Sequence, residues 1–211
     1  MPARSLFITG TDTGVGKTYV ACALLQQLRQ QNLNVCGYKP VASGCERTSA
    51  GLRNDDAVAL QRAAGTTEPY ERINPYAFEP AIAPHLAAAS AGVRIEPARL
   101  NEAHAQLSAH RDLIVVEGAG GWQVPLNEAT TFADWVAAQG WPVILVVGMK
   151  LGCINHALLS AEAISRRSNL IGWVANALPP EMPLLTQNIQ ALRERMPAPQ
   201  FTIAELASRL A

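Results

Sequence analysis

The stretch GTDTGVGKT at residues 10–18 follows a short apolar run, Ser5–Thr9, and leads into apolar residues at helical spacing. Its glycines let the backbone turn tightly and point N–H groups inward at an anion. A helix that starts at the end of this stretch adds the positive end of its dipole to the same place. In such a loop the ammonium of Lys17 reaches the outer phosphates of a nucleotide, and the hydroxyl of Thr18 binds magnesium. The stretch therefore predicts a phosphate-binding loop, or P-loop, between a strand and a helix.

Further short apolar runs predict the rest of the sheet. They are nearly continuous and do not alternate with polar residues, which is typical of parallel strands covered by helices on both faces. The predicted strands are Ser5–Thr9, Val35–Tyr38, Leu113–Val116, Val143–Val147 and Leu170–Ala175, with a weaker sixth near Gln200–Ile203.

The segments between these runs carry apolar residues at a period of about 3.6 and predict helices. One helix begins after Lys17, and the others are Asp56–Ala64, Ala98–His110, Phe132–Gln139, Asn155–Arg167 and Pro183–Met196. Alternating strands and helices predict a doubly wound, mainly parallel α/β sheet of P-loop NTPase type, with helices on both faces, in one domain over residues 1–211. Ser43–Asn54 and Pro69–Pro84, rich in Gly, Pro, Asn and Ser, are predicted as long loops.

The composition excludes several classes of protein. Hydrophobic residues make up 49% and charged residues 16%, which suits one sizeable core and argues against disorder. The 17 basic and 17 acidic residues cancel, whereas a nucleic-acid-binding domain normally has a basic surplus. We expect no membrane span, because no apolar run reaches about 18 residues, and no signal peptide. The four cysteines have no paired spacing, so we expect reduced thiols in a cytoplasmic protein and no zinc site.

A second lysine is predicted beside the phosphate loop. Lys39 follows the second predicted strand in the motif GYKPVASG, residues 37–44. Ligands of an open parallel sheet lie beyond the carboxyl ends of its strands, where the phosphate loop also lies. The Lys39 cation could stabilise charge on a transferred phosphoryl group, or it could hold an anionic substrate. Both interpretations stay open.

Two carboxylates are candidates for holding magnesium, which prefers oxygen ligands. Glu117 closes the apolar run LIVVE, as the acid of a Walker B element does, and glycines follow it at residues 118, 120 and 121. Asp56 begins a predicted helix, so it could instead be an ordinary acid at a helix start. The four residues Gly152–Asn155 precede another helix. They are either a second anion site or a plain helix start capped by Asn155.

Longer motifs resemble one family, the dethiobiotin synthases, which are ATP-dependent enzymes of biotin biosynthesis. GYKPVASG and KLGCINHALL carry more of the resemblance than the phosphate loop does. The matching segments are GTDTGVGKT (10–18), GYKPVASG (37–44), GLRNDDA (51–57), NPYAF (74–78), APHLAA (83–88), VEGAGGW (116–122), TFADWV (131–136), VILVVGMKLGCINHALL (143–159) and GWVAN (172–176). They span nearly the whole chain in the order found in the family.

The resemblance implies a reaction of 7,8-diaminopelargonic acid with carbon dioxide or bicarbonate and Mg-ATP. One amine takes up CO2 to form a carbamate, and ATP phosphorylates the carbamate to a mixed anhydride. The second amine then closes the ureido ring and expels phosphate. The products are dethiobiotin, ADP and phosphate.

The resemblance also implies roles for individual residues. The catalytic residues would be Lys39 and Lys17, and the magnesium ligands Thr18, Asp56 and Glu117. The ATP-binding residues would be Thr13, Gly14, Val15, Gly16, Lys17, Thr18, Asp56, Glu117, Gly118, Ala119, Gly120 and Asn176. The substrate-binding residues would be Thr13, Lys39, Ser43, Gly152, Cys153 and Asn155. In this assignment Asn176 reads the adenine edge.

The family works as a homodimer, so the resemblance implies that Gly152–Asn155 of one subunit faces the substrate tail held by the other. The end of the helix there would bind the substrate carboxylate. The chain departs from the family pattern at Gly14, at Ala177 and after Pro199, where relatives often carry a Gly-Glu-Ile-Pro-like segment near the nucleotide base.

Other enzymes with a P-loop remain as alternatives. A switch ATPase of the partitioning type would carry an extra lysine inside the loop, where this chain has Asp12 and Thr13. A cobyrinic acid amide synthase would need a further amidotransferase domain, and a nucleoside kinase would not be expected to carry GYKPVASG. A switch ATPase or another P-loop ligase is the second hypothesis.

Overall fold

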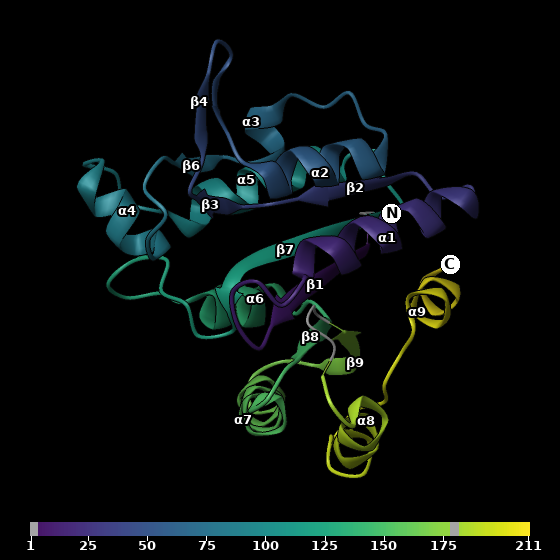
Figure 1. The fold of residues 1–211 in the computed structure, drawn as a ribbon. Helices are drawn as coiled ribbons and strands as arrows, with labels where there is room; N and C mark the ends of the chain where they lie inside the picture. Colours follow the sequence, from purple (N-terminus) through teal and green to yellow (C-terminus); the bar gives the residue numbers. More distant parts are fainter. Residues whose placement is uncertain (1–3, 178–181) are drawn as a thin grey trace.

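A five-stranded parallel sheet forms the centre of the computed structural model, which describes residues 4–177 and 182–211 (Figure 1). The strand order is β2-β7-β1-β8-β9, and every neighbouring pair is parallel. The strands are β1 (Arg4–Gly10), β2 (Val35–Tyr38), β7 (Leu113–Gly121), β8 (Val143–Met149) and β9 (Leu170–Ala177). All five strongly predicted runs are strands of this sheet, which confirms the doubly wound α/β class.

Helices cover both faces of the sheet because side chains along a strand alternate between its faces. In β1, Leu6 and Ile8 pack with α1, α2 and α9, whereas Phe7 packs on the opposite side with α5, α6 and α7. The bounds of these helices are α1 (Lys17–Gln30), α2 (Asp55–Ala64), α9 (Ile203–Leu210), α5 (Pro97–Ser108), α6 (Phe132–Gln139) and α7 (Cys153–Ser165). The carboxyl ends of β1, β2 and β7 therefore open between two covered faces.

The two segments predicted as long loops contain regular structure, so that prediction was wrong. The first contains an exposed hairpin that projects from the body of the protein (Figure 1). The second contributes a strand that pairs with the residues after Lys39 in a separate small sheet. The elements of this region are β3 (Val41–Ser43), β4 (Glu46–Thr48), β5 (Gly51–Arg53), α3 (Tyr70–Ile73), β6 (Tyr76–Phe78) and α4 (Pro84–Ser90). Each of these strands has three residues, which is too short for the sequence to show the alternation of a strand.

The prediction of a weak sixth strand near Gln200–Ile203 was also wrong. Gln200 makes a single bridge to Trp173, and the chain enters α9 at Ile203. Thr202 caps α9 by a reciprocal pair of hydrogen bonds with Glu205, a signal for a helix start rather than a strand.

Two predicted helix starts differ from the observed ones by two residues, and those of α2 and α5 differ by one. Helix α7 begins at Cys153 with Gly152 as its N-cap, so Asn155 is not a cap. Helix α8 spans Leu185–Arg193, within the longer range predicted.

In the part of the chain that the structure describes, no helix combines the length and hydropathy that crossing a bilayer requires. All four cysteines are free.

Candidate functional site

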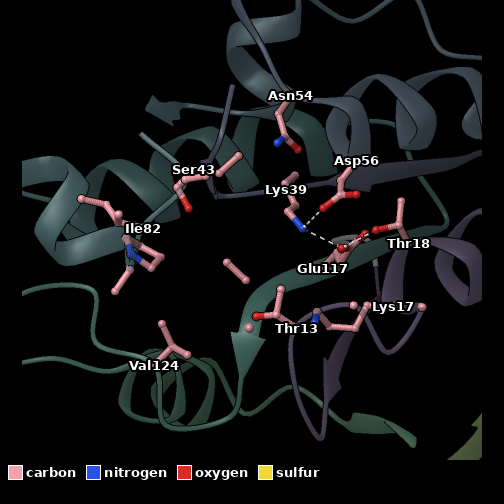
Figure 2. A pocket seen from close by; sticks show the side chains of 18 residues that line it. Thr13, Lys17, Thr18, Lys39, Ser43, Asn54, Asp56, Ile82, Glu117 and Val124 are labelled. Carbon is pink, nitrogen blue, oxygen red and sulfur yellow. Dashed lines mark hydrogen bonds and ion pairs between the residues drawn. The ribbon is translucent and has the colours of Figure 1, made fainter. Parts of the chain in front are cut away.

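A cavity of about 760 Å³ opens at the carboxyl ends of β1, β2 and β7 (Figure 2). This volume lies in the range of about 300–1,000 Å³ that is typical of small-molecule sites. The phosphate loop, the ends of β2 and β7, and the start of α2 form much of its wall. The predicted residues that line it are Thr13, Gly14, Gly16, Lys17, Thr18, Lys39, Ser43, Asp56, Glu117, Ala119 and Gly120.

The end of the phosphate loop requires glycine at position 16. Gly16 has a φ of 88°, in the left-handed region, and is the N-cap of α1. A Cβ there would lie 2.0 Å from the side-chain nitrogen of Asn176, which donates a hydrogen bond to the Val15 carbonyl at 2.9 Å. Among the described residues no side chain caps α1. The N–H groups of its first turn are therefore available to an anion in the cavity.

Lys17, the first residue of α1, is a buried cation at the same place. Its Nζ donates a hydrogen bond to the backbone carbonyl of Asp12 at 2.9 Å. Burial, together with repulsion from Lys39, lowers the pKa of Lys17 to about 8. Phosphate oxygens in the cavity would give this ammonium a negatively charged partner.

Lys39 lies between two carboxylates, of which Glu117 is buried and Asp56 is 42% exposed (Figure 2). Its Nζ is 2.6 Å from Glu117 Oε1 and 2.8 Å from Asp56 Oδ2. Burial opposes the charged form of Lys39, but the two carboxylates outweigh it and raise the pKa of the ammonium. Lys39 thus remains a cation although its own side chain is almost fully buried.

The backbone of Lys39 is held as firmly as its side chain. Its N–H donates to the carbonyl of Ile73 at 2.8 Å, and its carbonyl accepts from the side-chain amide of Asn74 at 2.7 Å. Both partners come from the second of the two mispredicted segments. The segment therefore fixes the place where the Lys39 side chain enters the cavity.

The oxygen atoms around this group suit a divalent cation. Glu117 is fully buried, and its Oε2 has no hydrogen-bond partner among the described residues. The hydroxyl of Thr18 donates to Glu117 Oε1 at 2.9 Å. The carboxylate of Asp56 lies close by, because its Oδ2 accepts from the same ammonium of Lys39 as Glu117 does. No group of three or more His, Cys, Asp or Glu side chains that could by itself hold a metal ion occurs in the described ranges. Two carboxylates and a hydroxyl fit Mg²⁺, which usually takes its remaining ligands from phosphate and water.

Three further predicted residues contact the loop or the strands behind the cavity. Val15 is fully buried in the core, and a Cβ on Gly118 would lie 2.8 Å from the ring of Phe7. Asn176 approaches the phosphate loop from β9 through its bond to Val15. These residues shape the loop from behind and do not line the cavity.

Gly152, Cys153 and Asn155 are not brought to the cavity of the same chain. Cys153 is buried beneath the start of α7, whereas Gly152 and Asn155 are exposed. The neighbouring Leu151 is 96% exposed, which is unusual for so large an apolar side chain. A role of this segment in substrate binding stays a prediction.

Several residues that line the cavity were not predicted as site residues. Ala42 directly precedes Ser43 in the sequence, and Asn54 lies two residues before Asp56. Val124 follows β7, and Ala81–Pro84 form a mostly apolar wall at the start of α4. Asn54 also accepts a hydrogen bond from Ala57 N and caps the helix that carries Asp56. The segments GLRNDDA and APHLAA contain some of these residues, and the cap pattern of Asn54 was the only direct signal.

Comparison with known proteins finds similar sequences over nearly the whole chain. Residues 4–207 match the family described as AAA domain. The ATP-dependent dethiobiotin synthetase BioD of Pseudomonas paraeruginosa is 53% identical over 201 residues, which cover 94% of this chain and 87% of that protein. The protein of the same name from Xylella fastidiosa is 48% identical over 202 residues, covering 95% and 89%. ATP-dependent dethiobiotin synthetase BioD 1 of Salmonella typhi is 50% identical over 197 residues, covering 93% and 86%.

Solved structures are more distant and show the fold alone. A ParA family ATPase from Chlorobium tepidum is 14% identical with a TM-score of 0.56, covering 100% of this chain and 92% of the other. The signal recognition particle receptor FtsY from Elizabethkingia anophelis is 13% identical with a TM-score of 0.53, covering 98% and 65%.

Proposed function

Since the chain belongs to the family of ATP-dependent dethiobiotin synthetases, we propose that it converts 7,8-diaminopelargonic acid, CO2 and ATP to dethiobiotin, ADP and phosphate. The relatives confirm the resemblance carried by its motifs. The observation that best supports the reaction is the buried ammonium of Lys39 at the wall of the cavity, beside the phosphate loop. We also propose that the protein acts in the cytoplasm.

The residues of the cavity divide the reaction between two regions. The backbone N–H groups after Gly16 and the ammonium of Lys17 bind the ATP phosphates. The ammonium of Lys39 stabilises first the carbamate and then the phosphoryl group that moves to it, since both are anionic. The hydroxyls of Thr13 and Ser43 contact the diamine or its carbamate from opposite sides of the cavity (Figure 2).

Thr18, Asp56 and Glu117 would hold the magnesium ion. Once bound, Mg²⁺ would neutralise part of the phosphate charge that develops during transfer. Lys39 contacts one oxygen of each of these two carboxylates, and the Oε2 atom of Glu117, which has no partner among the described residues, would be open to the ion. The ammonium of Lys39 would then lie beside the ion at the wall of the cavity that faces the substrate. Asn176, which lies next to the phosphate loop on β9, is proposed to contact the adenine.

The requirement for two substrates tests this proposal. Phosphate release from Mg-ATP should be slow alone and should rise only when both diaminopelargonate and bicarbonate are present. The control omits each in turn and includes a diamine without the carboxylate tail. A switch ATPase or a nucleoside kinase would release or transfer phosphate without responding to this pair, and that result would contradict the proposed reaction.

The metal ligands give a second expected result. Asp56→Asn and Glu117→Gln should each raise the magnesium concentration needed for half-maximal activity, because a neutral amide is a weaker ligand than a carboxylate. Asp55→Asn is a matched control, since its side chain begins the same helix and does not line the cavity. Activity titrated with magnesium at saturating ATP measures the effect. An unchanged titration in both variants would place the ion elsewhere.

We also propose that the active form is a homodimer in which Gly152–Asn155 of one subunit completes the substrate site of the other. The support is the start of α7, where no side chain of the described residues caps the helix and the positive end of its dipole favours a carboxylate. Leu151, which is 96% exposed, precedes that helix start, and Leu159, which is 58% exposed, lies further along α7. Both offer apolar surface to a partner. The diamine carries its carboxylate at the end of an aliphatic tail, far from the amines that react.

A further inference from the structure

The use of lysine in this chain points to a residue that the proposed function has not used. Only three of the 17 basic residues are lysines, and the others are arginines. Two of the three, Lys17 and Lys39, line the cavity. The third is Lys150, which directly follows β8 and lies at the same edge of the sheet. Lysine is thus confined to the neighbourhood of the phosphate loop.

Lys150 contacts the phosphate loop through Asp12. Its Nζ is 3.1 Å from Asp12 Oδ2, and these two residues are 138 positions apart in the sequence. The other oxygen of Asp12 accepts a hydrogen bond from the Thr13 N–H at 2.7 Å. The carbonyl of Asp12 accepts from Lys17 Nζ. Asp12 therefore joins Lys150 to two residues that line the cavity.

Asp12 is an unfavourable residue for this position. The hydrogen bond from Lys150, and next the one from Thr13, hold the pKa of Asp12 below its usual value, so its side chain is a carboxylate at neutral pH. A fixed negative charge in the loop repels the phosphates that the loop binds. Neither Asp12 nor Lys150 lines the cavity, so the ammonium of Lys150 acts on the carboxylate and not on the bound phosphates.

We propose that Lys150 is a positioning residue for ATP: it neutralises Asp12 and holds the turn of the phosphate loop in its binding form. The proposal rests on the proposed use of ATP and not on the identity of the diamine. The pair has little value for stability, because both side chains are about half exposed and such pairs contribute little to folding. Its effect should be on nucleotide affinity.

A double-mutant cycle on Asp12 and Lys150 tests the proposal. The dissociation constant of Mg-ATP is measured calorimetrically without diamine, and KM for ATP and kcat are measured with it. Lys150→Met should raise both the dissociation constant and KM about two- to fivefold, with kcat unchanged. Lys150→Arg should restore most of the affinity. In an Asp12→Asn background, which keeps the acceptor for Thr13, Lys150→Met should change affinity by less than about twofold.

Arg166→Met is the matched control. Arg166 is an exposed cation paired with the exposed carboxylate of Glu162 at the far end of α7, and its removal changes the net charge equally. It should leave the affinity for ATP unchanged. The proposal also expects the Lys150→Met effect to shrink in high salt, because exposed charges are screened, and the melting temperature to stay constant.

Three results would overturn the proposal. An equal loss of affinity from Lys150→Met with and without Asp12 would mean that Lys150 contacts phosphate directly. The same loss from Arg166→Met would mean a general effect of net charge. Unchanged affinity in Lys150→Met would mean that the pair is incidental. ATP binding is measured without diamine, so failure of the diamine-dependent reaction would contradict the proposed function and leave this result standing.

Discussion

Lys39→Ala is expected to lower turnover by about 10²–10³, the usual cost of removing one preorganised group that stabilises charge in a transition state. The carbamate and the transferring phosphoryl group are both anionic, and Lys39 is the buried cation that lies closest to Glu117 and Asp56. Binding of ATP should weaken less, because the phosphate loop and Lys17 remain. Single-turnover rates of ADP formation with saturating substrates measure the effect.

Two controls separate this loss from damage to the site. Removing Lys39 leaves the buried carboxylate of Glu117 without its partner, which can cost about 3–5 kcal/mol of stability. The melting temperature of Lys39→Ala is therefore measured beside that of Lys39→Met, which fills more of the space. The magnesium requirement should not rise, since the ammonium shares both carboxylates with the proposed ion. Near-normal turnover in a folded Lys39→Ala protein would exclude the assigned role.

A mixture of two inactive variants is expected to recover activity. Lys39→Ala removes the cation of one subunit's site, and Gly152→Trp blocks the helix start proposed to complete the partner's site. Each alone should be nearly inactive. In a closed two-fold dimer each mixed pair has one intact site, so random exchange should restore about a quarter of the wild-type activity.

The strain introduced at Gly152 needs its own control. Gly152 has a φ of 92° with open space where a Cβ would stand, and Gly140 has a φ of 66° with equally open space. Gly140→Trp therefore imposes similar backbone strain at the end of α6 and should retain activity. Subunit exchange is followed by labelling the two variants differently. Proven exchange without recovered activity would mean that each site is built from one chain.

The sequence was sufficient for the sheet and for three charged side chains of the site. The runs at Val35–Tyr38 and Leu113–Val116 are long enough to show a buried strand, and both became neighbours in the sheet. Because parallel strands end at a common edge, Lys39 and Glu117 were expected beside Lys17. All three line the same cavity. Local pattern and a rule of topology were enough here.

The sequence was not sufficient where short segments depend on distant partners. Strand β3 has three residues and forms only because β6 pairs with it, which no local period indicates. The residues around Gln200 looked like a strand from their apolar run, but the cap of Thr202 and packing against α1 favour a helix after them. Ala81–Pro84 carry no chemical signal of a site, and Asn54 carries only the pattern of a helix cap, so the fold alone brings these residues to the cavity.

By itself, then, the sequence determined the class of fold, the phosphate loop and the candidates for catalysis, because glycine spacing, apolar runs and strand ends are local features. Only the tertiary structure decided that one ammonium, that of Lys39, lies between Glu117 and Asp56, and that Lys150 meets Asp12 across 138 residues. Such contacts arise when separate elements pack against each other. Their geometry depends on the whole sheet and its helices, and neighbouring residues in the sequence do not encode it.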